Sequence, residues 1–267
     1  MHWERFEQGL IRAFGKERYW EVRYDLAYWW LRRSPQSFLS YGYSPLSPEI
    51  VTGRHGSEKF QLEMYEQVAQ TVGPEHLAAG RALEISCGLG GGFNYLRRRH
   101  GLGVAVGLDL SGPALRRTAR RFGVNVVRAD ATQLPFADQS FHTVVNVEAS
   151  HRYFGRRFLS EVARVLEPGG RLAMADLAYV ESDGFEDSMR RRFAKAGLEI
   201  IAFRDVTSNV IGGIEADSTR VERLIATVPW ALRPFFRLWA GTDRSQVYRD
   251  LRRRDALYFI LAARRTG

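Results

Sequence analysis

RALEISCGLGGG, residues 81–92, is the stretch that decides the fold of this chain of 267 residues. Residues 81–86 have the apolar composition of a buried strand, and residues 93–100 have the pattern of a helix. The glycines between them let the backbone of a turn approach a ligand closely. The stretch therefore predicts a strand, a ligand-binding turn and a helix, in that order.

Strands and helices alternate along the chain after this stretch. Apolar runs predict strands over residues 103–109, 124–128, 141–148, 171–176, 198–206 and 256–262. Helical patterns occupy residues 111–122, 155–166 and 188–197, and Ser111 can cap the first of these helices. The alternation predicts an α/β fold, with a mostly parallel sheet of seven strands and helices on both faces. Ligands of such sheets bind at the carboxyl ends of the strands.

The two ends of the chain differ from this middle in composition. All six tryptophans lie outside residues 31–229, and turn-forming residues occupy 44–57. Residues 218–228 and 245–254 have helical patterns and precede the last expected strand. The chain then divides into an N-terminal helical arm and lid over 1–57, a ligand-binding core over 58–211, a helical cap inserted over 212–255, and the last strand of the core over 256–267.

The composition excludes several classes of protein. Hydrophobic residues make up 45% of the chain and charged residues 26%, which suits a packed core rather than disorder. No apolar run approaches the ~18 residues of a membrane span, and Glu4 and Arg5 interrupt any signal-peptide core, so we expect a cytoplasmic protein. A single cysteine, Cys87, allows neither an intrachain disulfide nor a cysteine-based zinc site. The His, Asp and Glu residues lack the spacing of metal ligands, so we expect no metal.

The net charge of +9 raises nucleic acid or an acidic membrane surface as possible partners. Only three of the 39 basic residues are lysines, and 11 arginines against four acids lie from residue 220 onward. The excess charge therefore lies outside the expected core. Arg252-Arg253-Arg254 suits a solvated helix face better than a docking site, and we expect no stable complex with nucleic acid.

Acidic residues mark the edge of the sheet where a ligand should bind. Glu84 lies in the first strand, where a carboxylate repels phosphate and can bind an amino group. Asp109 ends the second strand, where an acid can accept hydrogen bonds from both ribose hydroxyls. Asp130 and Ala131 follow the third strand, where a side chain and a backbone N–H can contact an adenine edge. These groups together indicate S-adenosylmethionine; alternatively, Asp109 and Asp130 are only turn and cap residues.

Four motifs, at residues 83–92, 107–111, 130–136 and 164–170, together resemble the class I S-adenosylmethionine-dependent methyltransferases. The resemblance covers residues 82–177 and implies a Rossmann-like sheet with S-adenosylmethionine as the cofactor. Beside the acids above, it implies cofactor contacts at Ser86, Cys87, Gly88, Gly90, Leu110, Asn146 and Glu148.

A narrower resemblance points to the branch that methylates lipids, polyketides, sterols and sugars, in which the O-methyltransferases of mycobacterial phthiocerol-type lipids are most similar. It rests on residues 41–43, 60–65 and 146–151. In that branch, the positions of Tyr41, Tyr43 and Gln61 close over the cofactor; ordinary core packing is the alternative for these three side chains.

Two residues depart from the commonest pattern of the family. Ser86 stands where glycine is usual, although the lipid-type branch shows serine there too. His142 stands where aspartate is usual, at the start of a strand, and we expect it to be structural.

His151 and Asp176 are the candidates for chemistry. Methyl transfer from a sulfonium mainly requires alignment of the acceptor, but a hydroxyl acceptor must also lose its proton to a base. His151 has the pKa range of such a base, and Asp176 can orient it or bind the substrate. Related sugar and natural-product O-methyltransferases imply the same roles. The alternatives are a hydrogen-bonding role for His151 and a capping role for Asp176.

Aromatic residues in the arm and the cap predict a hydrophobic cover over the acceptor; packing or a homodimer seam is the alternative. They are Trp20, Tyr24, Tyr28, Trp29, Trp30, Trp230, Phe235, Phe236 and Trp239. We therefore expect a methyltransferase acting on a small hydrophobic or glycosylated natural product, at a hydroxyl oxygen, with His151 as general base. Carbon or nitrogen acceptors, RNA, and a non-enzymatic scaffold are the alternatives.

Overall fold

The structure is a computed structural model and describes residues 12, 15, 22, 24–25, 27–29, 31, 34–53, 56–180, 184–230, 233–237 and 240–267. Trp20, Trp30 and Trp239, three of the aromatic residues expected to cover the acceptor, lie outside the described residues, as does the side chain of Phe235. The residues described between Val22 and Leu31 are helical, as expected for the arm.

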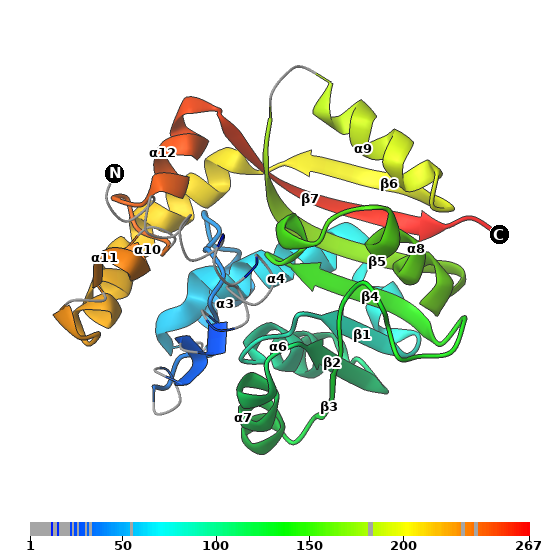
Figure 1. Ribbon diagram of the computed structural model, residues 1–267, viewed down its shortest axis with the longest axis horizontal. Helices are drawn as coiled ribbons and strands as arrows, with labels where there is room; N and C mark the ends of the chain where they lie inside the picture. Colours follow the sequence, from blue (N-terminus) through cyan, green and yellow to red (C-terminus); the bar gives the residue numbers. More distant parts are fainter. Residues whose placement is uncertain are drawn as a thin grey trace.

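Seven strands form one sheet in the order β3-β2-β1-β4-β5-β7-β6 (Figure 1). The strands are β1 Ala82–Ile85, β2 Ala105–Asp109, β3 Asn125–Arg128, β4 Phe141–Val147, β5 Leu166–Tyr179, β6 Leu198–Asp205 and β7 Ala256–Arg265. Strands β1 to β5 pair in parallel, whereas β7 runs antiparallel to both β5 and β6. The predicted mostly parallel sheet of seven strands is confirmed, with β7 as its antiparallel member.

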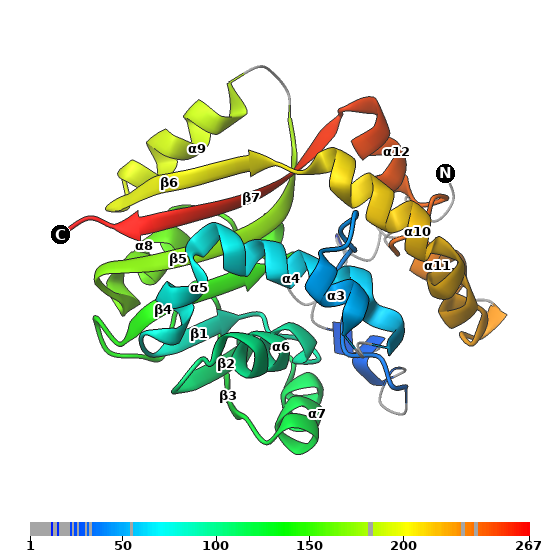
Figure 2. The same ribbon diagram turned by 180° about the vertical axis from the view of Figure 1, so that it is seen from behind.

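Helices cover both faces of the sheet, as Figures 1 and 2 show from opposite sides. They are α3 Pro48–Thr52, α4 Lys59–Val72, α5 Pro74–Ala78, α6 Gly91–His100, α7 Gly112–Phe122, α8 Arg156–Val165, α9 Phe185–Ala194, α10 Thr207–Ala226, α11 Arg233–Arg237 and α12 Gln246–Arg253. Short 3-10 turns lie at Gly56–Glu58 and Ser150–Arg152. No helix of the described residues is long and apolar enough to cross a membrane.

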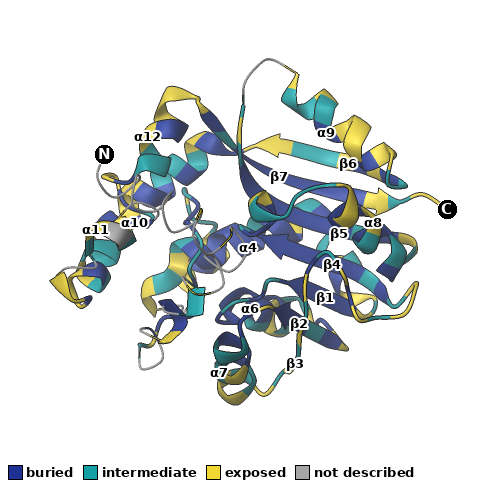
Figure 3. Cartoon of the chain, viewed as in Figure 1, coloured by how far each residue is buried: buried dark blue, intermediate teal, exposed yellow. Residues whose placement is uncertain are grey.

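The core has two parts because neighbouring strand residues point to opposite faces. Val145 packs with α4 and α6 on one face, and its neighbour Val144 packs with α8 and α9 on the other. Ala173 and Leu172 of β5 divide in the same way. The inner strands are therefore buried on both sides, as their dark blue colour in Figure 3 shows, and their carboxyl ends are held rigidly.

Helix α7 shows how local sequence fixes an element that positions the site. The Ser111 side chain accepts a hydrogen bond from Ala114 N at 3.3 Å, so the predicted N-cap is confirmed. The helix ends at Gly123, whose φ of 62° is the left-handed conformation that glycine adopts most easily. Its start thus lies directly after Asp109, at the end of β2.

Helix α10 begins earlier than the pattern over residues 218–228 indicates. Asp205 accepts hydrogen bonds from Thr207 N and Oγ1, at 2.9 and 2.5 Å, and starts the helix there. Gly213, which resembles a break in the helix, is needed because a Cβ would overlap the backbone of Gly42. The predicted border between core and cap at residues 211 and 212 therefore falls inside one continuous helix.

Replacing Phe158 by Ala tests the packing beneath α8. The Phe158 side chain is fully buried between α8 and the sheet. We expect Phe158→Ala to lower the free energy of unfolding by about 3–5 kcal/mol, because it loses apolar burial and leaves a cavity. Denaturant unfolding measures this, with Ser160→Ala on the exposed side of the same helix as a control within about 0.5 kcal/mol. Equal effects of the two changes would contradict the packing described.

Candidate active site

The carboxyl ends of the parallel strands open into a main cavity of about 1220 Å³. Ligand pockets usually measure about 300–1,000 Å³, so this one has room for a cofactor and an acceptor together. Ten residues expected at the site line it: Tyr41, Ser86, Cys87, Gly88, Asp109, Leu110, Asp130, Ala131, Glu148 and His151.

Four other expected residues lie behind the cavity wall. Glu84 reaches the wall through Tyr65, and Asp176 reaches it through His151. Asn146 donates from Nδ2 to Tyr153 Oη at 2.8 Å and so supports another lining side chain. Gly90 shapes the turn: its φ is 75°, and a Cβ there would overlap Thr118. These residues hold the wall rather than form its surface.

Gln61 and Tyr43 lie apart from this cavity. Gln61 lines a smaller pocket beside α10, where its Nε2 donates to Asp217 Oδ2 at 2.8 Å. Tyr43 packs in the core under α4 and accepts a hydrogen bond from Arg204 at 3.3 Å. The resemblance placed both beside the cofactor; in this structure Tyr43 follows the core-packing alternative, and Gln61 joins a polar network of the cap.

The glycine turn is shaped by close approach of side chains. A Cβ on Gly92 would overlap the ring of Tyr65, so only glycine lets α4 and α6 meet here. Ser86, just before the turn, has a φ of 60°, which explains why glycine is common at its position. Its hydroxyl is paired with Tyr153 Oη at 2.9 Å, which offsets part of the cost of this conformation.

The buried carboxylate of Glu84 has one oxygen to spare. Tyr65 Oη donates to Glu84 Oε1 at 2.8 Å, while Oε2 has no hydrogen-bond partner among the described residues. The residue is 2% exposed, and burial raises the pKa of its carboxyl to about 8. A buried acceptor without a partner is costly, so this oxygen indicates a donor or cation supplied by a ligand.

Asp109 holds the glycine turn and faces the cavity. Its Oδ2 accepts from Gly88 N and its Oδ1 from Ser111 N, both at 2.9 Å. Burial raises the pKa of this carboxyl despite these bonds. A carboxylate has about four acceptor sites, so two remain for hydroxyl groups of a ligand. The next residue, Leu110, is 51% exposed in the cavity, an apolar surface that a flat base would cover.

Asp130 combines the two roles that the sequence left open. Its Oδ1 accepts hydrogen bonds from Thr132 N and Oγ1, at 2.7 and 2.8 Å, as in an Asx turn. The turn also exposes Asp130, Ala131 and Thr132 to the cavity. The turn therefore presents both a carboxylate and backbone groups to the space beside Leu110.

Residues 34–43, here called the strap, cross the cavity and are fixed along their length. Arg117 of α7 donates to the backbone oxygens of Ser34 and Gln36, at 2.7 and 2.6 Å. Glu58 accepts from the N–H groups of Ser37 and Phe38, at 2.9 to 3.1 Å. These charge-assisted bonds hold the strap against the core.

The arm meets the cavity on the side of the glycine turn. Tyr28 is buried there, and a Cβ on Gly88 would lie 3.1 Å from its hydroxyl. The Arg152 guanidinium lies over the Tyr24 ring, 4.1 Å from its centroid, and joins the arm to the segment after β4. Tyr24 and Tyr28 thus line the cavity from the arm, whereas Trp29 is exposed.

Glu148 joins the strap to the sheet. Its carboxylate accepts from Tyr41 N at 2.8 and 2.9 Å and from Tyr258 Oη at 2.5 Å. Its φ of 53° is unusual for a residue with a side chain and marks a strained strand end. Burial raises the pKa of Glu148 to about 8, although these hydrogen bonds lower it.

His151 and Asp176 form a dyad at the cavity wall. His151 Nδ1 lies 2.6 Å from Asp176 Oδ1, and the other oxygen accepts from His151 N at 2.9 Å and Ser150 Oγ at 2.6 Å. Asp176 is 1% exposed. Burial raises the pKa of its carboxyl, but the nearby imidazole and these hydrogen bonds outweigh burial, so the pKa lies below its usual value. Burial lowers the pKa of His151, and the charge of Asp176 more than reverses this, so its pKa lies above 6.5. The dyad leaves Nε2 as the ring nitrogen for a ligand.

Comparison with known proteins identifies the family. A family described as "Methyltransferase domain" matches residues 83–174. The chain is 34% identical over 242 residues to the phthiotriol/phenolphthiotriol dimycocerosates methyltransferase of Mycobacterium leprae, covering 88% of this chain and 87% of the relative. This chain belongs to the S-adenosylmethionine-dependent methyltransferases. A fatty-acid O-methyltransferase of Mycolicibacterium smegmatis is also 34% identical, over 229 residues, covering 83% of this methyltransferase and 80% of the relative.

Solved structures of low sequence identity share the fold of this methyltransferase. The cyclase SpnF superposes with a TM-score of 0.69 at 20% identity, covering 92% of this chain and 94% of that chain. A geranyl diphosphate C-methyltransferase from Streptomyces coelicolor A3(2), solved with S-adenosyl-L-homocysteine, gives 0.60 at 18% identity, covering 91% and 98%. Because one neighbour is a cyclase, the fold alone does not determine the reaction.

S-adenosylmethionine is the cofactor of this methyltransferase, and the described residues fit it. We propose that Glu84, just behind the wall, stabilises the cationic amino-acid end, that Asp109 binds the ribose hydroxyls, and that Leu110 and the turn at Asp130 contact adenine. S-adenosylmethionine carries no phosphate, which agrees with the buried acids Glu84 and Asp109 in this part of the site. Among the residues described, no group of three His, Cys, Asp or Glu side chains could hold a metal ion.

Sequence reasoning missed three tyrosines that support expected site residues of the methyltransferase. Tyr65 supports Glu84, Tyr153 supports Ser86 and Asn146, and Tyr258 supports Glu148. Tyr65 lies on the buried face of α4, so its spacing indicates only core packing. Tyr258 lies on β7, 110 residues after its partner. Local patterns carry no signal for either pair.

Replacing Glu84 by Gln tests the cofactor contact. With a pKa of about 8, Glu84 is mostly protonated at pH 7 and should ionise when the cationic cofactor binds. We therefore expect proton release on binding, with affinity that rises with pH up to about 8. Glu84→Gln should remove this release and weaken binding about 10–100-fold, as expected for a hydrogen bond to a charged group. Calorimetric titration with S-adenosylmethionine in two buffers of different ionisation enthalpy measures both.

Glu66→Gln is the control for this experiment. Glu66 lies on the same helix as Tyr65, and hydrogen bonds from His100 and Tyr95 lower the pKa of its carboxyl to about 2 despite burial, so it is ionised throughout. We expect wild-type proton release from this variant. Equal release from wild type and Glu84→Gln would contradict the assignment.

Replacing Gly92 by Ala tests the support of Glu84 by Tyr65. The added methyl group would displace the Tyr65 ring and break its hydrogen bond to Glu84. We expect the dissociation constant for S-adenosylmethionine to rise about tenfold, equal to about 1.4 kcal/mol. Gly103→Ala is the matched control, because a Cβ there would meet no described atom within 4 Å. A folded Gly92→Ala protein with wild-type affinity would show that the pair does not serve the cofactor.

Proposed function

We propose that this methyltransferase transfers a methyl group to a hydroxyl oxygen of a small hydrophobic or glycosylated natural product, with His151 as general base. The observation that carries the proposal is the His151–Asp176 dyad at the wall of the main cavity. Asp176 is fully buried, while the His151 side chain remains 30% exposed. This is the arrangement of a base oriented by a carboxylate.

The surroundings of the dyad support a hydrophobic acceptor. Leu177, Tyr179 and Val247 line the cavity beyond Asp176, and Leu39 of the strap lines it from the other side. Tyr179 is an exposed aromatic residue in this part of the protein, as expected of a surface that contacts an apolar ligand. The names of the M. leprae and M. smegmatis relatives point to lipid acceptors as well.

The dyad can take the proton of a hydroxyl acceptor. Because Asp176 accepts a hydrogen bond from Nδ1–H of His151, the neutral ring presents the Nε2 lone pair to the cavity. The bound cofactor supplies an electrophilic methyl group, which moves to the acceptor oxygen as its bond to sulfur breaks. His151 Nε2 removes the hydroxyl proton, and the buried charge of Asp176 stabilises the imidazolium that forms.

Variants of the dyad test this role. We expect His151→Ala to lower kcat on the order of 10²–10⁴-fold with unchanged cofactor affinity, because it removes a general base. Transfer of tritiated methyl groups to hexadecan-2-ol measures kcat. His76→Ala is the control, since His76 stacks on His142, 4.0 Å between ring centroids, beneath the other end of the sheet. Wild-type turnover by His151→Ala would refute the mechanism.

The pH dependence of kcat/KM gives a second test. Activity requires neutral His151 and should fall as the pH drops through a pKa above 6.5. Asp176→Asn removes the charge that raises this pKa, so the acidic limb should move to lower pH while kcat falls. A limb that stays in place would show that Asp176 does not act on His151.

Carbon methylation is the second candidate, and Glu148 favours it. This carboxylate lines the cavity and is held by the backbone N–H of Tyr41, so a cationic carbon intermediate beside it would be stabilised. Mass spectrometry and NMR of the product distinguish a methyl ether or ester from a new carbon–carbon bond. The homodimer, the lack of stable nucleic-acid binding and the cytoplasmic location expected above stay predictions.

A further inference from the structure

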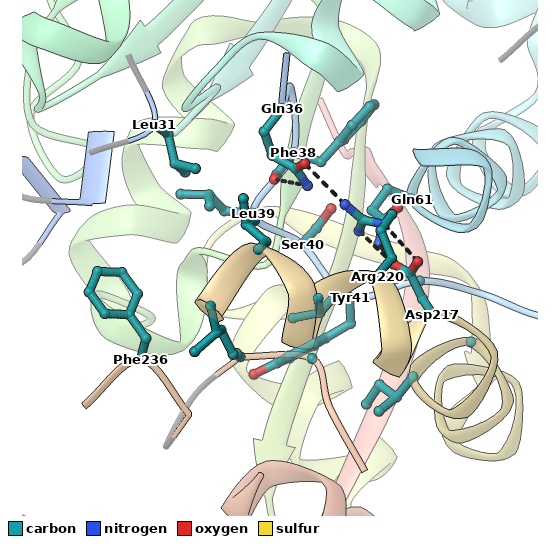
Figure 4. Close-up of a pocket in the computed structure, with 18 of the residues that line it drawn as sticks. Leu31, Gln36, Phe38, Leu39, Ser40, Tyr41, Gln61, Asp217, Arg220 and Phe236 are labelled. Carbon is teal, nitrogen blue, oxygen red and sulfur yellow. Dashed lines mark hydrogen bonds and ion pairs between the residues drawn. The ribbon is translucent and has the colours of Figure 1, made fainter. Parts of the chain in front are cut away.

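A second, smaller pocket lies between the strap and the cap. Its volume is about 70 Å³, and its lining comes from the strap, from Gln61 of α4, and from α10 and the segment after it. Most of the side chains are apolar, among them Leu31, Ile214, Leu224, Ile225, Val228 and Phe236. In Figure 4 Leu31 and Phe236 lie on one side, and the polar group of Gln61, Asp217 and Arg220 lies on the other.

Gln61 lines this pocket and has a buried acceptor without a described partner. The residue is 2% exposed, and its Nε2 donates to Asp217 Oδ2 at 2.8 Å. A carboxylate only accepts hydrogen bonds, so the amide must face Asp217 with its nitrogen. Its Oε1 then remains, and no described residue donates to it. A buried carbonyl oxygen of this kind calls for an O–H or N–H group of a ligand.

The orientation of Gln61 is fixed by a network that has no link to the cofactor. Arg220 donates to both oxygens of Asp217, at 2.7 and 2.6 Å, and to Gln36 Oε1 at 3.0 Å. Asp217 is thereby held in one place and holds the amide of Gln61. Residues of the cap and the strap thus fix the position of Gln61 Oε1 at the wall of an apolar pocket.

The strap forms a common wall of the two cavities. Phe38, Leu39, Ser40 and Tyr41 line both the main cavity and the smaller pocket. Ser40 Oγ is a second buried polar atom with no partner within the described part of the chain. Tyr41, in turn, is tied to Glu148 beside His151. A ligand that reaches from the dyad across the strap would therefore meet Ser40 and then Gln61.

We propose that this pocket binds a short aliphatic segment that carries a hydroxyl group, with the hydroxyl donating to Gln61 Oε1. An apolar cavity of about 150 Å³ binds benzene, so about 70 Å³ suits a segment of a few carbons. The identification of this segment as part of the methyl acceptor rests on the proposed function. The acceptor then has a second hydroxyl group, remote from the one that is methylated.

Binding of small probes to the intact protein tests the site without turnover. With methyl-labelled Leu, Ile and Val, we expect propan-1-ol to shift the NMR signals of Ile214, Leu224 and Ile225. Propane should shift the same signals with about tenfold weaker affinity, because it lacks the hydroxyl. Equal affinities, or shifts confined to other methyl groups, would overturn the proposal.

Three variants locate the interaction. Leu224→Trp fills the pocket and should abolish the shifts of Ile214 and Ile225, whereas Arg223→Trp, on the exposed side of the same helix, should leave them unchanged. Gln61→Met keeps the side-chain length and should reduce propan-1-ol binding to that of propane. Thermal unfolding of each variant verifies that it is folded. Wild-type preference for the alcohol in Gln61→Met would show that Gln61 does not accept a hydrogen bond from the hydroxyl.

Failure of this site and failure of the proposed function are separable. If the probes bind as expected but His151→Ala methylates hexadecan-2-ol normally, the pocket stands and the mechanism falls. If the dyad variants behave as expected but no probe binds beside Gln61, the mechanism stands and the subsite falls.

Discussion

The carboxylate of Glu148 joins three parts of the chain that lie far apart in the sequence. Glu148 directly follows β4, and its carboxylate accepts hydrogen bonds from Tyr41 N of the strap and from Tyr258 Oη of the last strand. The left-handed backbone of Glu148 turns the carboxylate into this position. Both walls of the active site, and the wall that the side pocket shares with it, depend on this junction because Tyr41 lines both cavities.

Buried acids such as this one are costly to ionise, and a bound cation would reduce that cost. Glu84 is raised in pKa by burial and by the charge of Asp109, and Glu148 by burial and by the charge of Asp176. A protein that carries a net charge of +9 therefore places buried acids beside its cofactor cavity, although Arg152, Arg156 and Arg157 also line that cavity. The cationic sulfonium and amino groups of S-adenosylmethionine would offset the charge of the buried acids. Other arginines are structural: Arg117 and Arg220 fix the strap and the cap.

The sequence predicts the parts of this protein that depend on neighbouring residues. The glycine turn, Asp109 and the cap at Ser111 follow from local patterns, and the parallel sheet follows from the alternation of strands and helices. Helix α10 was predicted too short: its first part packs through Gly213 against Gly42, a contact that no local pattern reveals. The position of Gln61 escaped prediction for the same reason: its partner Asp217 lies 156 residues further along the chain.

This division has a consequence for specificity. The part of the chain that matches the methyltransferase family, residues 83–174, builds the glycine turn and most of the predicted cofactor contacts. The strap and α10 lie outside it and supply most of the lining of the smaller pocket. Changes in these two segments can alter the space for an acceptor and leave Glu84 and Asp109 in place, because the hydrogen bonds described for these two carboxyl groups come from Tyr65, Gly88 and Ser111. Relatives that share the cofactor site can therefore differ in the acceptor that they bind. In this chain, the fixed amide of Gln61 would contribute to acceptor specificity.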